Sequence, residues 1–157
     1  MGLVEGARGG GVYGEIYGAD LSTAQGSLGT TQAAIDFSTI GASDGISNEV
    51  TPNVANDRID VVHAGNYRVH WEVSFSGTGY AIFKFHLRIG GVEQARAACV
   101  REIGTGGDVG NCGFDAMMTL AASDQLTIYV ETDNGADTDT MTIEDCHFNI
   151  ERMDQSG

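Results

Sequence analysis

An acidic segment late in the chain carries the residues best suited to bind a cation. The segment reads ETDNGADTDT, residues 131–140, and Gly135 within it allows a sharp turn. Hard cations such as Ca²⁺ take roughly six to eight oxygen ligands. Asp and Asn also favour turns, because their side chains hydrogen-bond to the nearby backbone. We expect a polar hairpin loop without a cofactor, and a Ca²⁺ site as the alternative. The ligands of that site would be Glu131, Asp133, Asn134, Asp137 and Asp139.

No group of residues has the spacing of a catalytic site. The sequence contains no nucleophile elbow, metal-binding triad or phosphate-binding loop. The glycines of residues 104–111 resemble a phosphate loop, but no helix follows them and Asp108 would repel a phosphate. With four histidines and 22 acidic residues, His–carboxylate pairs arise by chance. We therefore expect a protein that is not an enzyme.

The three cysteines are Cys99, Cys112 and Cys146. They are too few and too scattered for a disulfide scaffold or a zinc site. Cys99 and Cys112 could face each other across adjacent strands. We favour free, buried thiols, and a bridge between Cys99 and Cys112 is the alternative.

The net charge restricts the partners. Eight basic and 22 acidic residues give a formal charge of −14, and Lys84 is the single lysine. Such a surface repels phosphate, so no nucleic-acid partner is expected. No apolar run is long enough for a transmembrane helix, and the first residues lack the pattern of a signal peptide, so no membrane partner is expected.

Alternation of apolar and polar residues with a period of two predicts strands. It is clearest in residues 65–77 and 80–89, where His70 and His86 take outward positions. Residues 92–103, 111–120 and 125–133 continue the pattern, with a two-residue hairpin turn expected at Gly90–Gly91. The last strand, residues 140–153, changes its apolar phase near Glu144–Asp145, which predicts a bulge there.

The signal before Gly65 is weaker. Residues 11–18, 31–40 and 57–65 are candidate strands, and no segment has the pattern of an amphipathic helix. Eight to ten antiparallel strands in one chain of this length predict an all-β fold, a two-sheet jelly-roll sandwich. We expect this domain over residues 12–153, between a glycine-rich N-terminal arm, residues 1–11, and a short tail, residues 154–157.

Several stretches resemble, in order and spacing, the jelly roll of the tumour-necrosis-factor family and the complement globular heads. Gly65-x-Tyr67 opens the long central strand as it does in that family, and a turn from Leu120 to Leu126 precedes the next-to-last strand. Ser123 stands in that turn where glycine is usual. The closing pattern Phe-x-Ile-x-Arg corresponds to residues 148–152. The matching stretches are residues 64–75, 82–91, 118–130 and 146–153.

The resemblance implies a structural role. The same jelly roll occurs in trimeric decoration (cement) proteins of tailed bacteriophages, whose arm and body this chain resembles. We expect a decoration protein on the outer capsid surface of a virion, bound to the major capsid protein. The alternative is a head- or tail-fibre or spike domain that binds host-surface glycans, and a third hypothesis is a soluble ligand of the cytokine or complement type. Fold alone does not choose between them.

The resemblance also implies a homotrimer, in which one sheet faces the three-fold axis. Tyr, Met and His at outward strand positions suit an interface better than free solvent. The expected interface residues are Tyr13, Tyr17, His70, Met117 and His147.

The N-terminal arm is the expected capsid anchor. Its five glycines leave little apolar surface to order it alone. A glycine-rich strip can lie close against another backbone, with Leu3 and Val4 in small pockets and Arg8 paired to a carboxylate.

Overall fold

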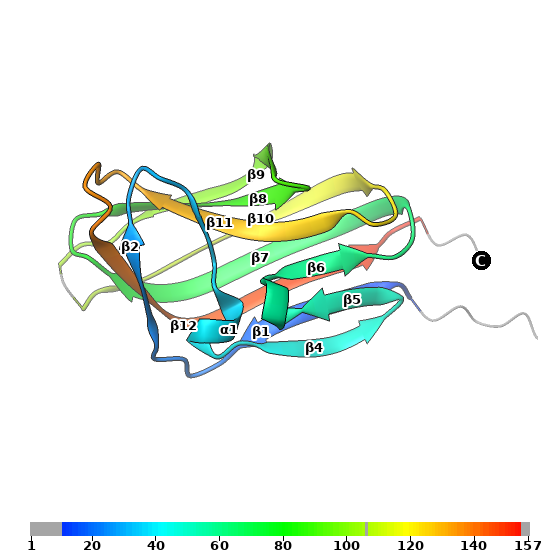
Figure 1. Ribbon diagram of the computed structural model, residues 1–157, viewed down its shortest axis with the longest axis horizontal. Helices are drawn as coiled ribbons and strands as arrows, with labels where there is room; N and C mark the ends of the chain where they lie inside the picture. The colour runs from blue at the N-terminus through cyan, green and yellow to red at the C-terminus, as the bar shows by residue number, and fades with distance from the viewer. Residues whose placement is uncertain (1–10, 106, 155–157) are drawn as a thin grey trace, which may run out of the picture.

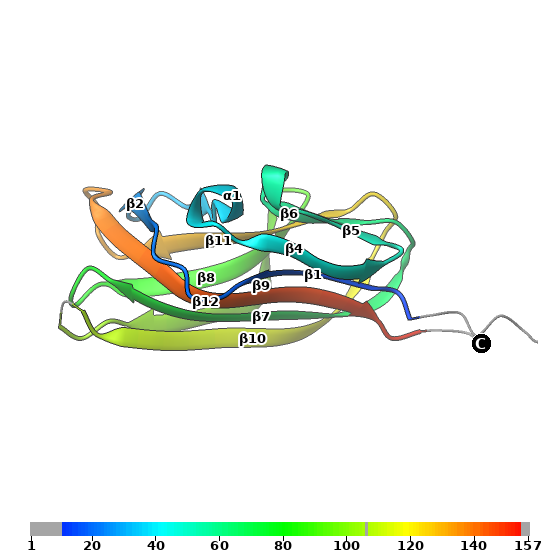
Figure 2. The ribbon, with the colours of Figure 1, turned by 90° about the horizontal axis from the view of Figure 1, so that it is seen from below.

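Two antiparallel sheets lie face to face in the computed structural model, which describes residues 11–105 and 107–154 (Figures 1 and 2). The sheet that we call sheet A has the order β10-β7-β12-β1-β4, and β2 also pairs with β12. Its strands are β1 (Tyr13–Gly18), β2 (Ala24–Leu28), β4 (Ser43–Asn48), β7 (Gly65–Gly77), β10 (Val109–Leu120) and β12 (Asp139–Arg152).

The second sheet, sheet B, has the order β5-β6-β11-β8-β9, and β3 also pairs with β11. The chain crosses between the sheets repeatedly, so that each contains strands from both halves of the sequence. This is the expected all-β jelly-roll sandwich. The strands of sheet B are β3 (Ala33–Ala34), β5 (Val50–Asn53), β6 (Arg58–Val61), β8 (Ile82–Ile89), β9 (Val92–Glu102) and β11 (Gln125–Thr132).

The alternating pattern places the core between the sheets. On β7, every second residue from Tyr67 to Phe75 is buried. On β12 the register shifts between Ile143 and Asp145, and the buried positions change phase there, from Ile143 to Cys146 and Phe148. The predicted bulge is therefore confirmed. One extra residue turns the second half of β12 to the correct face.

The predicted hairpin at Gly90–Gly91 is also confirmed. It joins β8 to β9, which pair in antiparallel fashion from Ile89 and Val92 onward. Both glycines have positive φ, 55° and 82°. That left-handed conformation is what a two-residue primed turn requires, and glycine adopts it without steric cost.

The prediction of a strand over residues 31–40 was wrong. Only β3 is extended there, and a short helix, α1 (Phe37–Ile40), follows it. Asp36 caps this helix, because its side chain accepts a hydrogen bond of 2.8 Å from the Thr39 N–H. Phe37 and Ile40 both point into the core. Apolar residues three apart in so short a segment do not distinguish a helical turn from a strand.

Three further strands, β2, β4 and β5, were not predicted. β2 and β4 are mostly polar and exposed, with sequences AQGSL and SDGISN, and the short β5, VTPN, buries only Val50. β4 and β5 lie at the edges of their sheets, and a 3₁₀ turn, Val54–Asn56, connects β5 to β6. A strand with neither face fully buried has no need for alternation, so its sequence carries no periodic signal. No helix in the described ranges is long and apolar enough to cross a membrane.

Aromatic rings join the sheets at the centre of the core. Trp71 of β7 lies 6.1 Å from Phe37, 5.9 Å from Phe85 and 6.3 Å from Phe148, measured between ring centroids. All four side chains are fully buried. Offset and edge-on aromatic pairs at these distances add to the stabilisation from burial.

Replacing Phe148 by alanine should therefore destabilise the fold strongly. The lost ring leaves a cavity against Phe37 and Trp71, which costs about 3–5 kcal/mol of unfolding free energy. Urea titration at fixed protein concentration, followed by the fluorescence of Trp71, the sole tryptophan, measures the change. Val92→Ala, at a side chain that is 65% exposed, is the control and should change stability by less than about 0.5 kcal/mol. Equal stability of the two variants would contradict the prediction.

Candidate functional site

The outer face of sheet A collects all five residues predicted for the trimer interface. Strand pairing aligns its side chains in rows that run across β1, β12, β7 and β10. One row contains Tyr17, His147 and Glu72; the next contains Glu15, Asn149, His70 and Asp115; the third contains Tyr13, Glu151, Arg68 and Met117. We call these eleven residues, together with Ile46 of the adjoining strand β4, the sheet A face.

Large apolar or aromatic side chains stand exposed at the margins of this face. Tyr13 is 37% exposed, Tyr17 44% and Met117 53%. Ile46 is 69% exposed, and its backbone N–H donates to Glu15 at 3.3 Å. A shallow cavity of about 290 Å³ lies beside Tyr13 and Ile46, lined by Tyr13, Gly14, Glu15, Ile46, Arg68, Asn149, Ile150 and Glu151. The face is therefore amphipathic, with a hollow beside its apolar margin.

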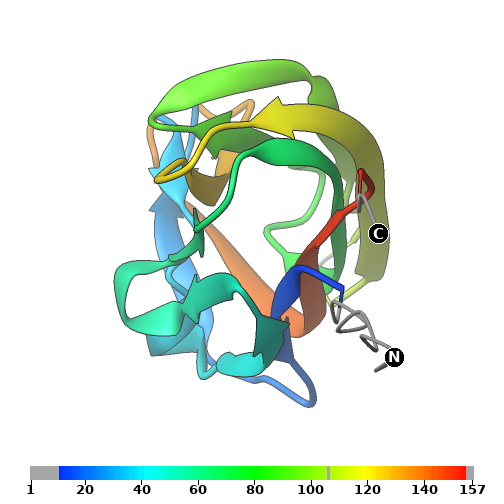
Figure 3. The same cartoon turned by 90° about the vertical axis from the view of Figure 1, so that its right-hand side faces the viewer.

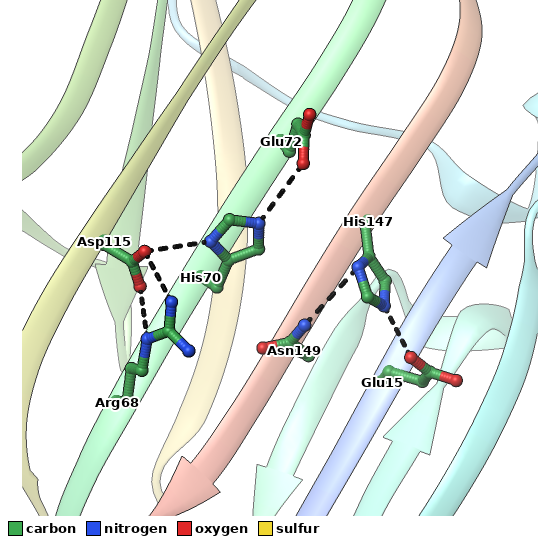
Figure 4. Close-up of polar contacts among 7 residues, drawn as sticks. All are labelled: Glu15, Arg68, His70, Glu72, Asp115, His147 and Asn149. Carbon is green, nitrogen blue, oxygen red and sulfur yellow. Dashed lines mark hydrogen bonds and ion pairs between the residues drawn. The ribbon is translucent and has the colours of Figure 1, made fainter.

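A polar network surrounds His70 (Figure 4). Its ring lies 3.3 Å from an oxygen of Asp115 and 3.5 Å from an oxygen of Glu72. Arg68 donates two hydrogen bonds to Asp115, each of 2.8 Å. These bonds from the guanidinium hold the pKa of Asp115 below its usual value, so that this carboxylate stays charged. Arg68 in turn has a raised pKa, because the same pair favours its charged form.

A second histidine lies beside the first. The rings of His70 and His147 are 6.1 Å apart at an angle of 73°. His147 Nε2 is 2.5 Å from Glu15 Oε2, and its other nitrogen is 3.5 Å from the Asn149 amide (Figure 4). Each imidazole thus has a carboxylate on the side away from the other. The network offers hydrogen-bond donors and acceptors side by side, an arrangement suited to polar recognition.

Sequence reasoning missed part of this face. Asp115 alternates with Phe114 and Ala116 on β10, so its outward direction was available from the pattern that placed Met117. Its pairing with Arg68 was not, because that depends on the register between β10 and β7. Ile46 carried no usable signal, since it is a lone apolar residue in the polar strand β4.

The residues predicted to bind Ca²⁺ accept hydrogen bonds from separate partners, although Asp133, Asn134 and Asp139 line one shallow cavity. Glu131 accepts from Lys84 and Gln32, at 3.4 and 2.8 Å. Asp133 accepts from the Ile82 N–H at 3.0 Å. Asp137 accepts from the backbone and hydroxyl of Thr31, while Asn134 Oδ1 accepts from the Ala136 N–H at 3.0 Å in a local turn. In the described part of the chain, no three His, Cys, Asp or Glu side chains gather as a metal site would need. The Ca²⁺ site stays a prediction.

Asp139 is the one buried carboxylate of this segment. Its two oxygens accept from the Thr132 hydroxyl at 2.6 Å and from the Asn134 amide at 3.1 Å. It is 3% exposed, and Thr132 is 4% exposed. The bonds from Thr132 and Asn134 therefore replace the water that Asp139 loses on folding. The predicted anchor residues Leu3, Val4 and Arg8 lie outside the described residues.

Removing the Asp139 carboxylate should destabilise the protein, because the buried hydroxyl of Thr132 donates its hydrogen bond to it. Asp139→Ala leaves the buried Thr132 hydroxyl without its acceptor, a loss of about 1–3 kcal/mol of unfolding free energy. Thr132→Val combined with Asp139→Ala should lose less than the sum of the single changes, because the hydroxyl that Asp139→Ala leaves without an acceptor is then removed as well. Chemical denaturation of the wild type, the two single variants and the double variant measures each loss of unfolding free energy. Additive losses would show that the two side chains do not depend on each other.

Comparison with known proteins supports the fold. No protein-family model matches the sequence, and no curated protein matches it. Solved structures do match: Eiger TNF from S. frugiperda has a TM-score of 0.63 and 13% identity, covering 94% of this chain and 95% of that one. Murine APRIL, in a crystal structure at pH 5.0, has 0.59 and 9%, covering 92% and 100%. The globular domain of zebrafish complement 1qA has 0.59 and 12%, covering 92% and 99%.

These likenesses extend over nearly the whole of each chain, so the shared feature is the entire sandwich rather than one motif. At such low identity they establish the fold and leave the function open. The chain has the TNF-like jelly-roll fold that the sequence predicted.

Proposed function

We propose that the protein is a non-enzymatic structural protein that forms a homotrimer through the sheet A face. The observation that carries the proposal is the gathering of Tyr13, Tyr17 and Met117 around the His70–His147 pair. Interface cores are enriched in aromatic residues and Met. The inner face of sheet A is already buried in the core, whereas these residues stand exposed on its outer face. Their exposure supports burial of this face against another copy of the chain.

The charges on the sheet A face affect how one copy of the chain associates with another. Arg68 is its one fixed cation, against the carboxylates of Glu15, Glu72, Asp115 and Glu151. Like charges brought together without compensation oppose association. The Arg68–Asp115 pair compensates one of them within the protomer, and His147 lies against Glu15. The exposed apolar margin then supplies the attraction.

A charge placed in the apolar margin should break the trimer. Met117→Arg places a desolvated cation at the proposed interface, and we expect the dissociation constant to rise at least about tenfold. Val92→Arg changes a similarly exposed residue on sheet B and should leave the trimer intact. Sedimentation velocity at micromolar concentration measures the species. A wild-type protein that stays monomeric there would remove the proposal.

We further propose that the trimer decorates the outer capsid surface of a bacteriophage particle, with the major capsid protein as its partner. The support comes from the N-terminal arm and from where it leaves the body. β1 begins at Tyr13, opposite Glu151 of β12, so the two ends of the sandwich domain lie side by side at one pole (Figures 1 and 3). Three arms leaving a trimer near such poles can bind together, so that weak contacts sum by avidity.

Deleting residues 2–10 should separate folding from attachment. The core and the sheet A face lie within the described residues, so the truncated protein should fold and form trimers with unchanged melting temperature. Its binding to shells assembled from the capsid protein should be lost, as measured by co-sedimentation with particles. Full occupancy by the truncated protein would show that the body alone docks. Retained binding to host-surface glycans without particle binding would favour the fibre or spike alternative.

A further inference from the structure

The two sheets meet along one long edge of the sandwich, where a pair of cysteines lies between them. β9, the last strand of sheet B, pairs with β8, and β10, the last strand of sheet A, pairs with β7. β10 follows β9 along the chain, with no other helix or strand between them among the described residues. Cys99 of β9 and Cys112 of β10 both pack against the core and are half-buried. Side chains rather than a strand ladder therefore bridge this edge.

The two sulfurs are already close. Cys99 Sγ and Cys112 Sγ are 2.7 Å apart, and either thiol could be the donor to the other. A disulfide bond has a length of about 2.05 Å, and it forms only where both side chains point at each other from suitably spaced backbones. The neighbours opposite them, Phe85 for Cys99 and Val73 for Cys112, are fully buried and hold both strands in register.

The third cysteine, Cys146, is too far from Cys112 to form a disulfide with it. Cys146 of β12 lies opposite Val73, and Val73 lies opposite Cys112 on its other side. Cys146 and Cys112 are thus two strand spacings apart, roughly 9–10 Å, which exceeds the Cα separation that a disulfide spans. Burial also raises the pKa of Cys146 to about 12, so its thiol is unreactive.

We propose that Cys99 and Cys112 form an intramolecular disulfide that joins the edges of the two sheets. The oxidant is a low-molecular-weight disulfide such as oxidised glutathione. The Cys112 thiolate attacks one glutathione sulfur and releases one reduced glutathione, which leaves a mixed disulfide. The Cys99 thiolate then attacks Cys112 Sγ and releases the second. Two protein thiols are oxidised, one glutathione disulfide is reduced, and two protons pass to the two departing thiolates.

The surroundings assign the first attack to Cys112. A hydrogen bond from the Cys99 thiol lowers the pKa of Cys112, and the positive charge of Arg101 lowers it further. Arg101 packs over β10, where any side chain at Gly110 would collide with it. The hydrogen bond with Cys112 raises the pKa of Cys99, and burial raises it further. The thiolate is the nucleophile in disulfide exchange, so the guanidinium of Arg101, which packs against Gly110 of β10, favours Cys112 as the first to attack.

The bond would close a loop of residues 99–112 in the unfolded chain. Closing a loop of about this length raises the melting temperature of a chain of this size by roughly 6–12 °C, if the native geometry carries no strain. The edge that carries Asp115 and Met117 would then be tied covalently to sheet B. This inference does not depend on the trimer or on the capsid, and it is tested on the isolated protein.

Thiol counting on the native full-length chain tests the proposal. After incubation with oxidised and reduced glutathione and acid quenching, alkylation in denaturant should modify one thiol per chain, against three after dithiothreitol. Trypsin leaves Cys112 and Cys146 in one peptide, residues 102–152, because no Lys or Arg lies between them. A second cleavage at Asp115 separates the two. Mass spectrometry should then find Cys99 linked to Cys112 and Cys146 alkylated.

Matched variants provide the controls. The double variant Cys99→Ser and Cys112→Ser should lose the rise in melting temperature that oxidation gives the wild type, whereas Cys146→Ser should keep it. Three free thiols after oxidation, a persistent glutathione adduct, or a link through Cys146 would each overturn the proposal. If a variant does not fold, the peptide map of the wild-type protein decides alone.

Discussion

The contact of Trp71 with Phe37, Phe85 and Phe148 is the interaction on which the arrangement of the molecule depends. It joins sheet A to sheet B and to α1, and every ring in it is fully buried. Because side chains alternate along a strand, fixing Trp71 inward fixes His70 and Glu72 outward. Fixing Phe148 inward likewise turns His147 outward. The histidine pair on the sheet A face is therefore set by the packing behind it.

The sequence predicted those parts of the molecule in which one face is buried. The alternation on β7, β8 and β12 was sufficient for the fold class, the bulge after Ile143 and the outward positions of His70 and His147. It was not sufficient for α1, where a cap by Asp36 decides between helix and strand, or for polar edge strands such as β4. Contacts between strands depend on register and on which edges meet, so the Arg68–Asp115 pair was not predicted and the approach of Cys99 to Cys112 was an open alternative. A single sequence does not contain that information.

The fold and the surface carry different kinds of information. Chains with 9–13% identity to this one share its sandwich, so many sequences satisfy the requirement for a packed aromatic and aliphatic core. The exposed side chains on sheet A have no such common requirement. The side chains of that face and the sequence of the arm are therefore particular to this chain.

The stability of the fold depends on pH through His86, a histidine on β8 of sheet B. His86 occupies the outward position expected of it on β8, yet it is fully buried, against Tyr129 and Arg88, and its Nδ1 has no partner among the described residues. Burial lowers its pKa from 6.5, and the nearby charges of Glu93, Lys84, Glu131 and Arg88 act in opposing directions. The unfolded chain takes up a proton there as the pH falls through 6.5, while the folded chain still excludes it. Acidification therefore draws the equilibrium toward the unfolded state, and His86 makes the sandwich less tolerant of acid than a neutral side chain would.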